Sequence, residues 1–157
     1  MLRGFELVRL DAPQPADGDA PQPVDVVELS YEERFKRRVV LTARGGLSFL
    51  LDLPKAQELR AGWAVLLEDG RQVEILEADE PLMVAVPRQA RDLATVAWHV
   101  GNRHMNCEIL ADRLVLQPNP VLAQMLEALG CSISYTQGPF RPLGGAFGHG
   151  RTHSHEH

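Results

Sequence analysis

The chain has 157 residues, of which 45% are hydrophobic and 24% are charged, and its formal net charge is -5 at pH 7. These fractions are typical of a soluble globular protein with one ordinary domain or two small ones. The negative charge argues against nucleic acid as a partner, because phosphate binding needs a positive field. No apolar run approaches the roughly 20 residues of a membrane span, so no membrane association is expected.

The N-terminus predicts a cytoplasmic protein. Residues 1–6 contain no sustained apolar core and lead into a loop rich in proline and aspartate, so they do not form a signal peptide. The two cysteines, Cys107 and Cys131, are too few for a disulfide framework. In a reducing cytoplasm both are expected to be thiols.

Residues 1–78 predict a small all-β domain of short antiparallel strands. Apolar alternation and turn residues place strands at 1–10, 24–29, 38–43, 47–52, 63–67 and 71–76. Arg44-Gly45-Gly46 and Glu68-Asp69-Gly70 are hairpin signals between neighbouring strands. The basic residues at 34 and 36–38 are interpreted as a solvated strand edge, with a phosphate patch as the alternative.

Residues 79–140 predict a ferredoxin-like domain, which makes the chain as a whole α+β. The expected elements, in order, are a strand at 82–86, a helix at 88–100, strands at 107–110 and 114–116, a helix from Pro120 to Gly130, and a strand at 133–135. Asn119 is the expected N-cap of the second helix, and Gly130 ends it. The order β-α-β-β-α-β is that of the split βαβ unit, with two helices on one face of a four-stranded antiparallel sheet.

Residues 141–157 predict a flexible tail, because proline and glycine are too frequent there for a packed element. The six histidines of the chain are divided between this tail, with His149, His153, His155 and His157, and the preceding domain, with His99 and His104. A neutral imidazole is a good ligand for nickel, copper and zinc. The last three histidines alternate with Ser154 and Glu156, so two or three imidazoles can converge on one ion, with Glu156 as an optional oxygen ligand. Metal capture is favoured over the two alternatives, an engineered purification tag and a neutral low-complexity end.

His104 follows the first predicted helix, where a lone histidine is usually structural. One imidazole per chain cannot hold a metal tightly, but in a two-fold dimer a residue near the axis appears twice. Such a site is open and poor in ligands, which suits an ion that is passed on. His99 lies about 140° round an ideal helix from His104, so the two share an ion only if Gly101 breaks the helix. Cys107 is an alternative ligand, although a small buried strand residue is its favoured role.

Residues 98–104, with the sequence Trp-His-Val-Gly-Asn-Arg-His, resemble the HLGNRH signature of the UreE family of urease accessory proteins, which are nickel metallochaperones. Residues 138–150 are similar to the family's PF.PEGGAYGHG ending, which precedes a histidine-rich tail, and residues 66–71 resemble part of its N-terminal domain. The resemblance implies a homodimer built through the ferredoxin-like domains, in which His104 and its symmetry mate bind Ni2+. It also implies a peptide-binding-like N-terminal domain and a tail that adds metal capacity or delivery. The implied partners are the accessory GTPase UreG and, through it, the urease apoprotein.

Two departures from the family pattern limit what the resemblance implies. Some members carry additional histidines just before the second helix, where this chain has Gln-Pro-Asn-Pro at 117–120, so no peripheral metal site is expected there. Leu143 replaces the usual acidic residue before the tail, which removes one oxygen ligand.

Three other classes of function compete with a metallochaperone. An enzyme is not expected, because the chain has no G-x-S-x-G, H-E-x-x-H or phosphate-binding Gly-Lys-Ser/Thr motif. An RNA-binding module would present aromatic residues on its central strands, and residues 107–116 contain none. A general zinc, copper or nickel buffer remains the alternative, since imidazoles alone do not select nickel over Zn2+ or Cu2+.

Overall fold

The computed structural model describes residues 1–11 and 22–144, and it has the mixed α+β architecture predicted from the sequence. The chain folds into two units, Met1–Ala78 and Asp79–His157. The predicted flexibility of the tail, and the positions of its four histidines, lie outside the described residues.

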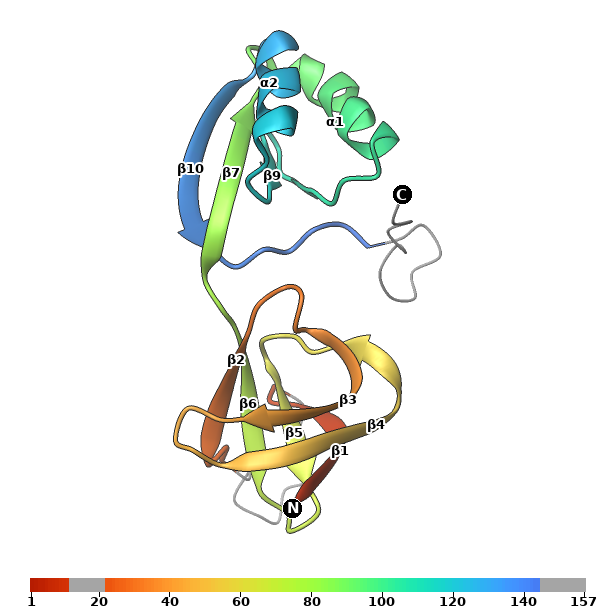
Figure 1. Ribbon diagram of the computed structural model, residues 1–157, viewed down its shortest axis with the longest axis vertical. Helices are drawn as coiled ribbons and strands as arrows, with labels where there is room; N and C mark the ends of the chain where they lie inside the picture. Colours follow the sequence, from red (N-terminus) through yellow and green to blue (C-terminus); the bar gives the residue numbers. More distant parts are fainter. Residues whose placement is uncertain (12–21, 145–157) are drawn as a thin grey trace. The chain divides into compact units, whose positions relative to one another are not determined.

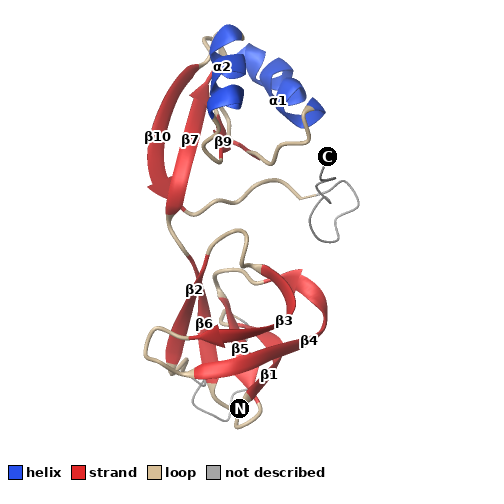
Figure 2. Cartoon of the chain, in the orientation of Figure 1, coloured by secondary structure: helices blue, strands red, loops and turns tan. Residues whose placement is uncertain are grey.

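The N-terminal unit is one six-stranded sheet (Figures 1 and 2). Its strands are β1 (Arg3–Arg9), β2 (Asp25–Leu29), β3 (Phe35–Thr42), β4 (Ser48–Glu58), β5 (Trp63–Leu67) and β6 (Gln72–Glu77). They lie in the order β2-β6-β5-β1-β4-β3, so β2 and β3 form its two edges. The strands predicted between residues 1 and 76 are therefore present, with ends that differ by a few residues.

The prediction that all these strands run antiparallel is wrong. β1 pairs with β4 in parallel, and β2 pairs with β6 in parallel. Both parallel pairs join strands that are far apart in the chain, whereas the hairpin β3–β4 and the neighbours β5–β6 are antiparallel, as two-strand hairpins must be. Alternation and turn residues reveal that a strand exists, but they do not identify a distant partner or its direction.

β4 is also longer than the predicted strand, which stopped before Pro54. The pairing of β3 with β4 changes register between Lys36 and Arg38, whose partners are Gln57 and Asp52. Residues 53–56 therefore lie opposite the single residue Arg37. Proline removes a backbone donor, and this irregular stretch is where a strand tolerates that loss.

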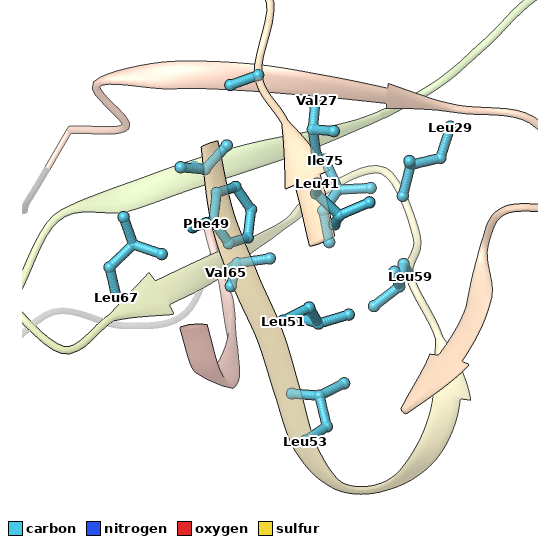
Figure 3. Packing of buried hydrophobic residues seen from close by; sticks show 12 residues of the cluster. Val27, Leu29, Leu41, Phe49, Leu51, Leu53, Leu59, Val65, Leu67 and Ile75 are labelled. Carbon is cyan, nitrogen blue, oxygen red and sulfur yellow. The ribbon is translucent and has the colours of Figure 1, made fainter. Parts of the chain in front are cut away.

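The core of the N-terminal unit is an apolar cluster whose side chains converge between the strands (Figure 3). Phe49, Leu51 and Val65 are completely buried. Full burial of one such side chain contributes about 1.5–3 kcal/mol, so this cluster is the main source of the unit's stability.

The interpretation of the basic stretch is correct for Arg37 and Arg38, which are exposed on edge strand β3, and wrong for Arg34. Arg34 is only 3% exposed, and its guanidinium carbon lies 5.6 Å from the centre of the Tyr31 ring. A guanidinium can be buried against an aromatic face because of its planar, weakly hydrated charge. Arg34 is thus part of the fold.

The C-terminal unit has the ferredoxin-like order that was predicted. Its elements are β7 (Glu80–Val86), a 3-10 turn η1 (Ala90–Asp92), α1 (Leu93–Asn102), β8 (Glu108–Ile109), β9 (Leu114–Leu116), α2 (Pro120–Ala128) and β10 (Ser132–Gly138). The sheet order is β10-β7-β9-β8, and all of its pairs are antiparallel. Both helices lie on the same side of this sheet (Figure 2).

The two helices bury one face each in a second apolar cluster. Val96 and Val100 of α1 and Leu122 and Leu126 of α2 pack with sheet residues such as Met83. Asn119 caps α2 as expected, since its side-chain oxygen accepts a hydrogen bond from the Leu122 N–H at 3.0 Å. The burial of Val100 holds the C-terminal end of α1 against the sheet, and His104 follows directly after this end.

Candidate metal site

His104 lies just beyond the last turn of α1 and has left-handed backbone geometry, with φ of 56°. The His104 N–H donates to the Gly101 carbonyl at 3.0 Å, and the Met105 N–H donates to the Val100 carbonyl at 3.4 Å. This pair of hydrogen bonds is a Schellman motif, the common way to satisfy the last carbonyls of a helix. The chain therefore leaves the helix abruptly at His104.

The imidazole of His104 is exposed, and none of the described residues forms a hydrogen bond or an ion pair with it. No bond from the described residues therefore occupies its ring nitrogens. A neutral imidazole in this state can offer one nitrogen to a metal ion.

His99 is half-buried within α1, and its ring contacts the Trp98 ring edge-on, with the centroids 5.0 Å apart. The helix continues through Gly101 to Asn102, so Gly101 does not break it. Within residues 1–11 and 22–144, no group of three or more histidine, cysteine, aspartate or glutamate side chains could hold a metal. His99 and His104 thus lack a third ligand from the described part of their own chain.

Cys107 is half-buried directly before β8, and burial raises the pKa of its thiol. The buried Cys131 also has a raised thiol pKa, because of burial and the nearby negative charge of Asp92. A thiolate is the form that binds metals, and a raised pKa disfavours it. Neither cysteine is therefore prepared as a ligand.

The segment that leads into the tail is fixed close to the end of α1. Phe140 is completely buried, and the Leu143 N–H donates to the Cys107 carbonyl at 3.0 Å. Cys107 is three positions after His104, and His149 is six positions after Leu143. Residues 140–143, which are described and precede the tail, therefore lie close to the segment that follows His104. Sequence patterns did not predict that this segment is attached to the domain. The one feature that could have indicated it is Phe140, a large apolar residue directly before the Pro/Gly-rich tail.

Trp98 is the large apolar side chain most exposed on α1, at 63%. It lies on the same helix as the turn that carries His104, six positions earlier in the sequence. Exposed aromatic residues of this size are common at protein–protein interfaces. The described residues thus supply one open imidazole, an exposed apolar side chain on the same helix, and a contact that fixes Leu143 beside the segment after His104.

Comparison with known proteins gives matches along almost the whole chain. The model for the UreE urease accessory protein, N-terminal domain, matches residues 8–86, and the model for the C-terminal domain matches residues 80–157. The urease accessory protein UreE of Rhodobacter capsulatus is 47% identical over 133 residues, which cover 85% of this chain and 83% of the relative. That of Azorhizobium caulinodans is 40% identical over 163 residues, which cover 100% of this chain and 76% of the relative. That of Ruegeria pomeroyi is 44% identical over 133 residues, which cover 85% and 87%.

Proposed function

The chain belongs to the UreE family of urease accessory proteins, and on this premise we propose that it is a nickel metallochaperone that binds Ni2+ as a homodimer and delivers it for assembly of the urease active site. Membership of the family makes it an accessory protein of urease maturation. The observation that carries the proposal is the open imidazole of His104 at the end of α1.

The homodimer is needed because one imidazole per chain is too weak a ligand set. Two-fold symmetry brings a second His104 to the axis and doubles the number of ligands without any change in sequence. The exposed Trp98 supports this arrangement, since it gives the second copy an apolar surface on the helix that leads to His104. Nickel held by so few protein ligands is readily transferred.

The tail is proposed to add ligands and to assist delivery. His149, His153, His155 and His157 supply imidazoles beyond the pair at the axis, and the attachment of Leu143 beside Cys107 starts the tail near that pair. We assign residues 1–78 to partner binding, residues 79–140 to dimerisation and nickel binding, and residues 141–157 to additional metal capture.

The expected partners are the accessory GTPase UreG and, through it, the urease apoprotein, in the cytoplasm. The chain acts as a carrier and not as an enzyme, so nickel is its cargo. Among the described helices, none combines the length and apolar character needed to cross a membrane. Nucleic acid is not proposed as a partner, because the net charge is -5.

The test is a nickel titration by calorimetry of a chain that ends at Gly148 and therefore lacks all four tail histidines. We expect this protein to bind fewer ions per dimer than the full chain but to keep one site. His104→Ala should then weaken that site by more than the ~10–100-fold that loss of a supporting group causes. Binding should also weaken toward acid pH, because only the neutral imidazole coordinates.

His99→Ala is the matched control, since it removes an imidazole from the same helix and should leave nickel affinity unchanged. An unchanged titration for His104→Ala would exclude His104 as a ligand. Loss of every site in the truncated protein would place all binding in the tail. Zn2+ and Cu2+ bound as tightly as Ni2+, with no transfer to urease, would favour the general buffer.

A further inference from the structure

The two helices of the C-terminal unit end in the same turn, but with different residues at its critical position. At the end of α1, the N–H groups of residues 104 and 105 donate to the carbonyls of residues 101 and 100. At the end of α2, the Gly130 N–H donates to Glu127 and the Cys131 N–H donates to Leu126, both at 2.9 Å. The left-handed residue is Gly130 in α2, with φ of 93°, and His104 in α1, with φ of 56°.

Glycine is the usual residue at this position, because a side chain clashes with the backbone in left-handed geometry. His104 is the one non-glycine residue with positive φ in the part of the chain that the structure describes. Its imidazole is exposed and forms no hydrogen bond with residues 1–11 or 22–144. The fold therefore gains nothing visible from histidine here, and strained residues of this kind are concentrated at functional sites.

Met105, the residue after His104, anchors the turn to the domain. The Met105 N–H closes the outer hydrogen bond to Val100, and the Met105 side chain packs against the apolar cluster that contains the fully buried Val100. This apolar contact is the usual companion of a Schellman motif. It fixes the backbone on both sides of His104 and hence the direction of its Cα–Cβ bond.

We infer that this left-handed turn, anchored by Met105, is the positioning element of the nickel site and sets the direction in which His104 presents its imidazole. Metal-binding histidines are usually oriented by a hydrogen bond from the second ring nitrogen. None of the described residues provides that bond to His104, so the backbone performs the orientation instead. Met105 is a positioning residue and His104 the ligand, and the inference rests on the proposed function for the identity of the metal.

The first test moves the imidazole while preserving the turn. The parent is the full-length chain in which the four tail histidines are replaced by serine (H149S, H153S, H155S, H157S), so that only the site of the folded domain remains. In this background the double variant Arg103→His/His104→Gly keeps a residue suited to the turn and shifts the ring by one position. We expect nickel binding, measured by calorimetry, to be lost as completely as in His104→Ala. The control Arg103→Ala should bind like the parent.

Nickel affinity that survives in the double variant would overturn the inference, because the direction given by residue 104 would then be unnecessary. If His104→Ala itself binds nickel like the parent, the proposed function fails instead. The two failures are thus distinguishable.

The second test loosens the anchor. Met105→Ala should raise the nickel dissociation constant about tenfold, at the lower end of the effect of losing an orienting group. Met105→Leu, which restores an apolar side chain of similar size, should return it to within about twofold of the parent. Circular dichroism and sedimentation must confirm that each variant is folded and has the parent's oligomeric state. Equal affinity for Met105→Ala and the parent would overturn the role of Met105.

The third test measures the strain without metal, by urea unfolding in the presence of a chelator at equal protein concentrations. His104→Gly should raise the ratio of folded to unfolded protein about fivefold, which corresponds to about 1 kcal/mol. Gly130→Ala, at the equivalent position of α2, should lower the ratio by a similar factor. A Cβ at Gly130 would meet Arg88 no closer than 3.7 Å, so steric crowding does not complicate this control. A His104→Gly protein no more stable than the parent would show that histidine carries no strain here.

Discussion

The two units of the chain differ in where they leave apolar side chains. Nine large apolar side chains are exposed among the described residues, and six of them belong to the C-terminal unit. The other three are Met1, Val24 and Val40, which lie at or near the N-terminus, beside the start of β2 and on edge strand β3. The N-terminal unit therefore encloses its apolar residues, whereas the C-terminal unit exposes apolar surface on both helices and two strands.

The histidines follow the same division. All six are in the second half of the chain, and none occurs among the first 98 residues. The N-terminal unit therefore has an enclosed core and no histidine, whereas the C-terminal unit has a core of its own and also carries the exposed imidazole of His104 and most of the exposed apolar side chains. This difference between the two units leads to the following predictions.

The largest effect is expected for the closed core. Phe49 is completely buried in the N-terminal cluster, so Phe49→Ala should lower the free energy of unfolding of this unit by about 3–5 kcal/mol in urea denaturation. Val40→Ala, at an exposed site of β3, should change it by less than about 0.5 kcal/mol. A nickel affinity that falls in the folded Phe49 variant would contradict the separation of the two units.

A smaller effect is expected at the exposed surface of α1. Trp98→Ala should weaken homodimer formation by about 2 kcal/mol, the threshold effect of an interface hot spot, as measured by sedimentation equilibrium. Tyr135→Ala on β10 is the control, since Tyr135 has a similar exposure of 65% but lies on a different element. Equal dimer affinities for the Trp98 variant and the wild type would exclude this face from the interface.

The cap of α2 gives a still smaller effect. Asn119→Ala removes the side-chain acceptor of the Leu122 N–H and should lower the free energy of unfolding of the C-terminal unit by about 1 kcal/mol. Asn119→Ser retains an acceptor and should recover most of this loss. Nickel affinity should be unchanged in both, because α2 carries none of the proposed ligands.

The smallest effect concerns the stability of the N-terminal unit at acid pH. The backbone N–H groups of Gly45 and Val26 donate to Asp25 and hold the pKa of its carboxyl group below the ordinary 3.8. Because the folded state has the lower pKa, the ionised carboxylate stabilises the fold above about pH 4, and this contribution is lost as the pH falls through the folded pKa. Asp25→Asn should therefore lose less stability than the wild type between pH 5 and pH 3 in urea denaturation. Parallel pH profiles would contradict this role of Asp25.

Sequence patterns predicted features that depend on neighbouring residues. Asn119 and Gly130 mark the ends of α2 through capping and left-handed geometry, which are local properties. The parallel pairing of β1 with β4 was not predicted, because the pairing direction of distant strands is set by tertiary packing. The extension of β4 past Pro54 was missed for a related reason, since the tolerance of proline depends on a bulge formed with β3.

For the candidate site, too, the sequence predicted the local features but not those that depend on tertiary structure. His104 follows from its motif and from its place after a helix, but its left-handed backbone does not, because glycine is the residue expected there. The burial of Phe140 was not predicted either, since the packing of its side chain depends on residues distant in the sequence. Sequence thus identified a candidate ligand, and the structure adds how the chain presents it.

The hydrogen bond between the Leu143 N–H and the Cys107 carbonyl has a consequence for the transfer of nickel in the proposed function. A ligand joined to a site by a short stretch of chain is present there at an effective concentration in the millimolar range. For the proposed carrier, a tail imidazole would therefore outcompete dilute free chelators for an ion that leaves His104. The ion would pass between ligands of the same dimer without entering bulk solvent, where other ligands would compete for it.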